Sequence, residues 1–313
     1  MGEDEWNSKK GEVITLADNV HSEKELTDLM CKEQSIRDPI DTVQYKFILI
    51  PKYMDGKGAV ILKSHHCLAD GLGFSFLFLA ISDVWDKNAL PALKPMGILK
   101  TTLVYTLLPF LVLKSGIEIC LQFKDNNIIK KNVPMSGRKN GAYTEDIDLL
   151  KLKALAKANG ATVNDFMTAV LSNTIYKYFD DHKNEKFEGV KSVGPNGFII
   201  PKKINIGMPF SLRQPVKDLK DLKLNNDFAA LPLKIGVYEK FEPALSAFKK
   251  QFKSMRTSLN PFGVLYVFKT SISLPFTLPK YTVDWISDKY TLIFSNLMAS
   301  KIQFKWDGHP TIG

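Results

Sequence analysis

The chain has 313 residues, 45% of them hydrophobic, so it is long and apolar enough to bury a substantial core. Its 42 basic and 33 acidic residues give a formal net charge of +9, but only four of the basic residues are arginine. Proteins that read bases or clamp phosphates bidentately depend on arginine, so the composition disfavours a nucleic-acid partner. We expect the lysines to form a solvated surface. The alternative is that they attract anionic lipid or a phosphate-bearing substrate.

The N-terminal region contains no predicted signal peptide, because residues 1–10 are polar and charged and no apolar segment follows them. Cys31, Cys67 and Cys120 are isolated in the sequence, which fits a reduced, cytosol-facing protein better than a disulfide-bonded secreted one. None of the three has the spacing of metal ligands, and we expect no metal site.

Two histidines lie between a predicted hairpin and a predicted helix. Residues 42–50 predict a strand, the turn-forming residues 53–58 predict a hairpin, and residues 59–62 predict its second, buried strand. The segment HHCLADG follows at residues 65–71, and residues 72–85 predict a helix. Because successive side chains of a strand point to opposite faces, we expect one histidine to point inward and the other to face a cleft.

The residue types in this turn suit proton transfer. Asp70 precedes Gly71 at the predicted helix start, where a carboxylate can accept backbone N–H bonds. A helix N-terminus disfavours a protonated imidazole nearby, which keeps a general base neutral. Gly71 permits a tight turn and the close approach of a substrate. The alternative is an ordinary polar strand end in which Asp70 only caps the helix.

Two other kinds of chemistry are disfavoured at the same turn. A nucleophilic dyad of Cys67 and His66 is geometrically poor, since neighbouring side chains on an extended chain diverge. A zinc site from His65, His66 and Cys67 is also disfavoured, because consecutive residues rarely wrap one tetrahedral ion.

Residues 98–123 are unusually apolar. Their uncharged part, residues 101–113, is flanked by lysines and interrupted by Pro109, whereas a membrane-spanning helix needs roughly 20 apolar residues. We therefore expect a helix that lies in a membrane interface or packs inside the protein, and the apolar residues 261–279 allow the same two interpretations.

The second half of the chain begins after a predicted linker at residues 124–141, which is polar and rich in turn formers. Residues 149–158 predict a helix that Gly160 stops, and residues 163–179 predict a second helix. This second helix starts with Thr-Val-Asn-Asp at residues 162–165, which has the form of a capping box. Asn164 and Asp165 are therefore expected to fix the helix start.

Several motifs together resemble one enzyme family. The pattern HHxxxDG resembles the active-site motif of acyl-CoA-dependent acyltransferases built like chloramphenicol acetyltransferase. The helix start TVND at residues 162–165, the strand ending in Ser-Leu-Arg at 211–213, the segment LNNDF at 224–228 and Ser-Asn at 295–296 resemble the wax ester synthase/diacylglycerol acyltransferase branch. These matches run in the family's order from about residue 25 to the end of the chain. The family's Pro-Gly-Pro turn is replaced by Met-Ala-Ser at residues 298–300, and the chain is short for the family at both ends.

The resemblance implies an α/β fold of two chloramphenicol acetyltransferase-like subdomains, each a mixed sheet flanked by helices, with a substrate tunnel between them. The expected subdomains are residues 1–137, which carry HHxxxDG, and residues 138–313. The implied activity is transfer of a fatty acyl group to a long-chain alcohol or diacylglycerol, with acyl-CoA as co-substrate and no cofactor. We expect peripheral attachment to a cytosol-facing membrane: endoplasmic reticulum, plasma membrane or lipid droplet.

The resemblance also assigns roles to residues. His66 is the expected general base, His65 is chiefly structural, and Asp70 and Gly71 organise the site. Asn164, Asp165 and Arg213 are expected to support the site. Arg213 would do so by holding Asp70, and the alternative is that it is a surface residue. A catalytically impaired lipid- or acyl-binding relative, or an acyltransferase for a smaller alcohol or amine, is the alternative.

Overall fold

A computed structural model describes residues 3–86, 88–90, 97–191, 193–194, 197–211, 213, 216, 218–273, 275, 278–297 and 300–311. The chain forms two compact units, each assembled from separate stretches of sequence. Unit 1 comprises Met1–Phe74, Pro134–Asp146 and Lys223–Asn226, and unit 2 comprises Ser75–Val133, Ile147–Leu222 and Asp227–Gly313. Both units take residues from either side of the boundary predicted after residue 137, and that boundary stays a prediction.

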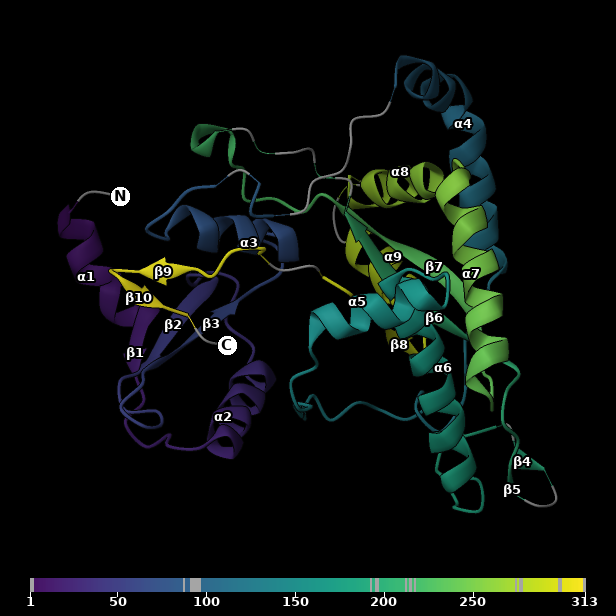
Figure 1. The fold of residues 1–313 in the computed structure, drawn as a ribbon, viewed down its shortest axis with the longest axis horizontal. Coiled ribbons are helices and arrows are strands. Elements are labelled where there is room, and N and C mark those ends of the chain that lie inside the picture. Colours follow the sequence, from purple (N-terminus) through teal and green to yellow (C-terminus); the bar gives the residue numbers. More distant parts are fainter. Residues whose placement is uncertain are drawn as a thin grey trace. The chain divides into compact units, whose positions relative to one another are not determined.

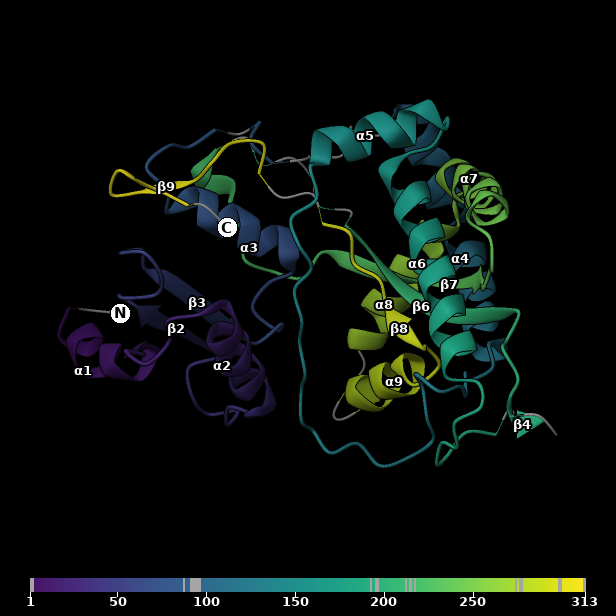
Figure 2. The same ribbon diagram turned by 60° about the horizontal axis from the view of Figure 1, so that its bottom comes forward.

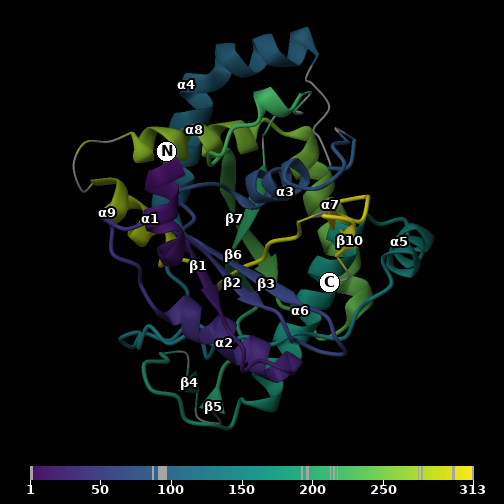
Figure 3. The same cartoon turned by 90° about the vertical axis from the view of Figure 1, so that its left-hand side faces the viewer.

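Unit 1 contains a mixed sheet in the order β1-β2-β3 (Figure 3). Strand β1 (Ile14–Leu16) pairs in parallel with β2 (Tyr45–Ile50), and β2 pairs antiparallel with β3 (Ala59–Ser64). Helix α1 (Glu3–Val13) contacts β1 and β2, and α2 (Glu23–Ser35) contacts β3.

The predicted hairpin between β2 and β3 is confirmed. Its turn places Asp55 at φ 49° and Gly56 at φ 73°, both in the left-handed region. Asp and Gly adopt that region more readily than bulkier residues, so the turn forms where the local sequence allows it.

Helix α3 (Gly71–Ala80) follows the hairpin and is shorter than predicted, since it ends five residues before Trp85. Contacts of Ser82 and Asp83 hold the chain in a non-helical path after Ala80. The Ser82 hydroxyl donates to the Leu79 carbonyl at 2.7 Å. The Asp83 carboxylate accepts two backbone N–H bonds, each 2.8 Å long, from the turn between β9 (Lys305–Trp306) and β10 (His309–Pro310). The Asp83 contacts join residues 224 and 225 positions apart, so local hydrophobic periodicity does not report them.

Unit 2 contains a second mixed sheet, in the order β7-β6-β8. Strand β6 (Lys203–Ser211) pairs antiparallel with β7 (Phe228–Gly236) along its whole length and in parallel with β8 (Leu292–Ile293). Strands β4 (Val193–Gly194) and β5 (Gly197–Phe198) form a separate antiparallel pair. The expected α/β class with mixed sheets is therefore confirmed.

Helices surround this sheet. In sequence order they are α4 (Ile98–Leu121), α5 (Leu149–Ala158), α6 (Val163–Asp181), the 3-10 helix η1 (Leu219–Asp221), α7 (Phe241–Thr257), α8 (Asn260–Ile272) and α9 (Leu278–Ser287). Helix α6 packs on α7, α5 packs on α6, and α8 packs on β7, α4 and α9 (Figures 1 and 2). Apolar side chains of β6, α6 and α7 form the largest core: Ile204, Ile206, Met208, Phe166, Phe179, Phe248 and Phe252.

Local signals predict α5 and α6 well. Helix α5 has its predicted bounds, with Asp148 as a cap that accepts from the backbone N–H groups of Leu150 and Lys151. Gly160 lies just beyond it at φ +59°, as expected of a helix stop. The capping box of α6 is present, since Thr162 and Asp165 exchange backbone-to-side-chain bonds of 3.2 and 2.8 Å.

Helix α4 differs from the expectation of an interrupted segment, because it continues through Pro109 for 24 residues. It is long and apolar enough to cross a membrane by length and composition, and 22% of its most apolar window is buried. Its buried residues are Val104, Leu111, Ser115 and Ile119. The opposite side carries exposed apolar residues that we call the apolar stripe: Leu99, Leu103, Phe110, Leu113, Ile117 and Leu121. At about 100° per residue these six side chains fall within roughly 80° of the helix circumference.

The buried side of α4 packs against α8 at Gly263. A Cβ atom on Gly263 would lie 2.5 Å from Ser115 Oγ and would also collide with the Leu111 carbonyl oxygen. Only glycine permits the two backbones to approach so closely. The part of the apolar segment that forms α8 thus contributes helix packing within unit 2.

Candidate active site

The HHCLADG segment forms the turn between β3 and α3. Strand β3 ends at Ser64, so His65 and His66 lie beyond it, and both side chains are exposed. The expectation that one histidine points inward is therefore wrong, because the alternation of side chains holds only within a strand.

His65 is tied to the turn itself. Its backbone N–H donates to the Gln44 carbonyl at 2.9 Å, one step beyond the β2–β3 ladder. Its ring Nδ1 accepts the backbone N–H of Cys67 at 3.1 Å. A ring nitrogen that accepts a hydrogen bond carries no proton, so the neutral His65 ring has its proton on Nε2.

Asp70 lies where the sequence predicts it, at the start of α3, and is 4% exposed. Its Oδ1 accepts the Gly73 backbone N–H at 2.7 Å, and its carbonyl accepts the Phe74 N–H at 3.0 Å. Gly71 is the first residue of the helix. The carboxylate therefore holds the helix start to the turn that carries the histidines.

A segment far away in the sequence completes this turn. Residues Lys223–Asn226 belong to unit 1, and the Asn225 carbonyl accepts the Asp70 backbone N–H at 3.4 Å. The Asn226 side chain makes two contacts with His66: Oδ1 lies 3.0 Å from the ring Nδ1, and Nδ2 donates to the His66 carbonyl at 2.7 Å. Sequence reasoning missed Asn226 as a site residue, and its only signal was its place in the LNNDF match.

The other predicted residues lie in unit 2. Asn164, at the start of α6, accepts a 2.6 Å hydrogen bond from the side chain of Asn296, which brings the TVND and Ser-Asn motifs together. Asp165 is buried in the capping box, and its Oδ1 lies 3.5 Å from Arg256 Nη1. The capping box shows Asp165 at work in fixing the helix start, whereas the role expected of Asn164 stays a prediction.

Arg213 is buried in unit 2, and its backbone N–H donates to Ser211 Oγ at 3.2 Å. Its pairing with Asp70 stays a prediction, as does a substrate tunnel. Leu212 of the Ser-Leu-Arg match and residues 298 and 299 of the Met-Ala-Ser replacement lie outside the described residues.

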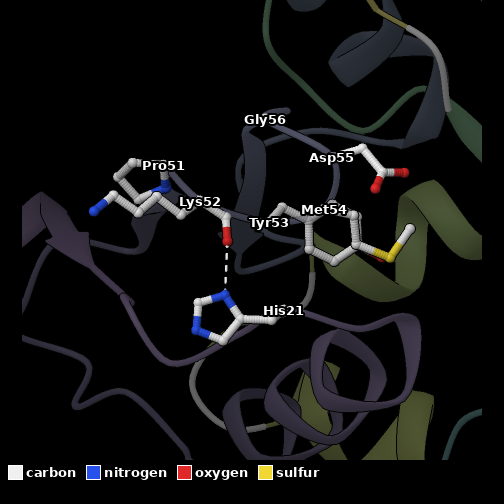
Figure 4. Close-up of a pocket in the computed structure, with 7 residues that line it drawn as sticks. All are labelled: His21, Pro51, Lys52, Tyr53, Met54, Asp55 and Gly56. Carbon is white, nitrogen blue, oxygen red and sulfur yellow. Dashed lines mark hydrogen bonds between the residues drawn. The ribbon is translucent and has the colours of Figure 1, made fainter.

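A separate cavity of about 580 Å³ lies at the opposite end of the β2–β3 hairpin from the histidine turn (Figure 4). It is lined by His21 and by residues 51–56 of the hairpin turn, and the His21 Nδ1 lies 2.8 Å from the Lys52 carbonyl oxygen. Burial, and next the charge of Glu23, raise the pKa of the Tyr53 hydroxyl in this lining. None of the predicted site residues lines the cavity.

No group of three or more His, Cys, Asp or Glu residues in the described part of the chain is placed to hold a metal ion. The histidine turn brings together two imidazoles, a helix-capping carboxylate and an asparagine amide.

Comparison with known proteins gives a fold but no close relative. The sequence matches no family model and no curated protein. The structure is similar to the wax ester synthase/diacylglycerol acyltransferase from Marinobacter aquaeolei VT8, with a TM-score of 0.55 and 15% identity over 96% of this chain and 65% of that one. It is also similar to the starter condensation domain of rhizomide synthetase in complex with C8-CoA and Leu-SNAC, with a TM-score of 0.50 and 11% identity over 95% of this chain and 63% of that one.

The chain thus spans less than two thirds of the length of these neighbours. At such low identity the likeness concerns the fold, and activity and substrates do not follow from it. The fold expected from the sequence motifs is confirmed: the chain has the fold shared by wax ester synthase/diacylglycerol acyltransferase and condensation domains.

Proposed function

We propose that this protein transfers a fatty acyl group from acyl-CoA to the hydroxyl of a long-chain alcohol or diacylglycerol, with His66 as the general base. The observation that carries the proposal is the His66 ring, bound by Asn226 in the turn between β3 and α3. Two neighbours support the choice of chemistry, since one is a wax ester synthase/diacylglycerol acyltransferase and the other was solved with C8-CoA.

In this reaction His66 takes the hydroxyl proton while the oxygen attacks the thioester carbonyl. The tetrahedral oxyanion then collapses, the carbon–sulfur bond breaks, and the CoA thiolate leaves and recovers the proton from His66. A general base contributes about 10²–10⁴ in rate, and the positioning of both substrates contributes much of the remainder. The thioester is already an activated acyl donor, so the reaction calls for no cofactor.

The test compares His66→Ala with His65→Ala, using labelled acyl-CoA and either a long-chain alcohol or diacylglycerol. We expect His66→Ala to lose about 10²-fold or more in turnover, because it lacks the base. His65→Ala should keep more activity, since the His65 ring contacts the backbone of its own turn. Near-normal turnover by a folded His66→Ala protein would overturn the proposal.

The alternative function is the binding of acyl groups without catalysis of their transfer. The wild-type protein would then bind acyl-CoA in calorimetry but release no CoA with either acceptor. Turnover with a short alcohol or an amine, and none with lipophilic acceptors, would instead identify an acyltransferase for smaller substrates.

We also propose that α4 touches a cytosol-facing membrane through its apolar stripe. Phe110 and Leu113 of the stripe are 64% and 63% exposed, whereas Leu111 on the opposite side is 6% exposed. A helix with one side packed on α8 and an uncharged apolar side in solvent suits contact within the membrane interface. Such contact would bring the enzyme to acceptors that dissolve in lipid.

A further inference from the structure

We infer that Asn226 sets the tautomer of His66, so that the lone pair of the neutral ring lies on Nε2. The inference deepens the proposed function, because it names the residue that prepares the base, and its catalytic consequence rests on that function. The contact itself is a property of unit 1 and is testable without any substrate.

The first step is the orientation of the Asn226 amide. Its nitrogen lies 2.7 Å from the His66 carbonyl oxygen, which can only accept a hydrogen bond. The NH₂ group must therefore face that carbonyl, and the amide oxygen must face the imidazole. The reversed amide would place two acceptors against each other.

The second step is the protonation of the ring. The Asn226 oxygen lies 3.0 Å from His66 Nδ1 and cannot donate, so Nδ1 must carry the proton. In a neutral imidazole the lone pair is then on Nε2. Because the same amide also binds the His66 backbone, it fixes the ring orientation as well as the tautomer.

Comparison with His65 shows that the tautomer assigned to His66 depends on its own hydrogen-bond partner. The two histidines are adjacent in one turn, yet His65 Nδ1 accepts a hydrogen bond while His66 Nδ1 donates one. Their neutral rings therefore hold opposite tautomers. The difference comes from the partners, a Cys67 backbone N–H in one case and the Asn226 side-chain oxygen in the other.

Asn226 reaches this position because its segment is anchored to the same turn. The Asn225 carbonyl accepts the Asp70 N–H, and Asp70 caps α3. Asn226 thus acts through His66 and is a positioning residue.

The test uses the full chain labelled with ¹⁵N in its histidine rings and observed by nuclear magnetic resonance. The chain has five histidines, and the His66 signals are those lost in His66→Ala. In the neutral wild-type ring we expect a protonated Nδ1 and an unprotonated Nε2. In Asn226→Ala we expect a substantial population of the other tautomer.

Activity supplies the second readout. If about a tenth of the rings in Asn226→Ala keep the Nε2 lone pair and the orientation, kcat falls about tenfold while KM changes little. Asn173→Ala is the matched control, since its amide also donates to backbone carbonyls but lies in unit 2 with Tyr238 and Glu239. It should leave the His66 signals unchanged.

Asn226→Asp keeps the inference testable if Asn226→Ala does not fold, because one carboxylate oxygen still accepts from Nδ1, although the variant loses the bond to the His66 carbonyl. This variant should retain the wild-type tautomer. The inference is wrong if wild-type His66 carries its proton on Nε2, if Asn226→Ala keeps the wild-type tautomer, or if Asn226→Asp switches it. The expected spectra together with no acyl transfer by the wild-type protein would overturn the proposed function alone.

Discussion

At the scale of single residues, Asp70 is expected to organise the turn without exchanging protons with substrate. Its Oδ1 accepts the Gly73 N–H at the start of α3, close to the positive end of the helix dipole. Asp70→Asn keeps an oxygen for this bond but removes the negative charge. We therefore expect a lower melting temperature and lower acyl-transfer activity, with no new titration in the pH–rate profile.

The measurement is a pair of experiments on Asp70→Asn: thermal unfolding, and acyl transfer across pH. His65→Ala is a suitable reference, because it alters the same turn at an exposed position. A shifted pH profile in a protein whose stability is unchanged would show instead that Asp70 transfers protons.

The residues of the turn differ in how far the sequence could predict them. Asp70 and Gly71 follow from local chemistry, since a carboxylate before a glycine at a helix start is a cap signal. Asn226 could not be found in this way, because its partner His66 lies 160 residues earlier in the chain. Nothing in the periodicity around residue 226 reports a contact at that separation.

At the scale of elements, helices closed by their own caps were predicted best. Helix α5 has its predicted bounds, and α6 begins at its predicted residue, because Asp148, Thr162 and Gly160 act within one or two turns of where they lie. The predicted end of α3 was wrong, because the β9–β10 turn binds Asp83 outside the helix. Helix α4 was predicted to be interrupted at Pro109, but its packing on α8 supports the full 24 residues.

The apolar stripe of α4 gives a prediction at this scale. Replacing Leu103, Phe110 and Leu113 together by serine removes apolar area from an exposed face, so the variant should stay folded and lose its binding to lipid vesicles. Flotation with vesicles and a thermal unfolding scan measure the two properties.

Leu111→Ser is the matched control on the same helix, because its side chain is buried within unit 2. It should lower the melting temperature instead. The membrane proposal fails if the triple variant unfolds, or if the wild-type protein does not float with vesicles.

At the scale of the whole molecule, the net charge of +9 should add an electrostatic component to membrane binding. Lysines near a surface of anionic lipid are attracted to it, and salt screens the attraction of exposed charges. Vesicle binding should therefore strengthen with anionic lipid and weaken as salt rises from about 0.05 M to about 0.5 M. Zwitterionic vesicles are the control, and equal binding to both, independent of salt, would contradict this component.

The order of motifs was sufficient to predict an α/β fold with two mixed sheets, but it did not reveal that Lys223–Asn226 belongs to unit 1. Hydrophobic periodicity and caps report neighbours a few residues apart. The addition of Lys223–Asn226 to unit 1 depends on contacts with Asp70 and His66, which only the folded chain brings together.

The position of Lys223–Asn226 in the sequence has a consequence for the nascent chain during translation. Translation at roughly 5–20 residues per second needs roughly 8–32 s to add the 160 residues that separate His66 from Asn226. Throughout that interval the hairpin and its histidine turn exist on the ribosome without the amide that orients the base. Unit 1 receives its last residue with α7, α8 and α9 still to be synthesised. A nascent chain released before Asn226 would thus carry the complete HHxxxDG motif and yet lack a prepared base.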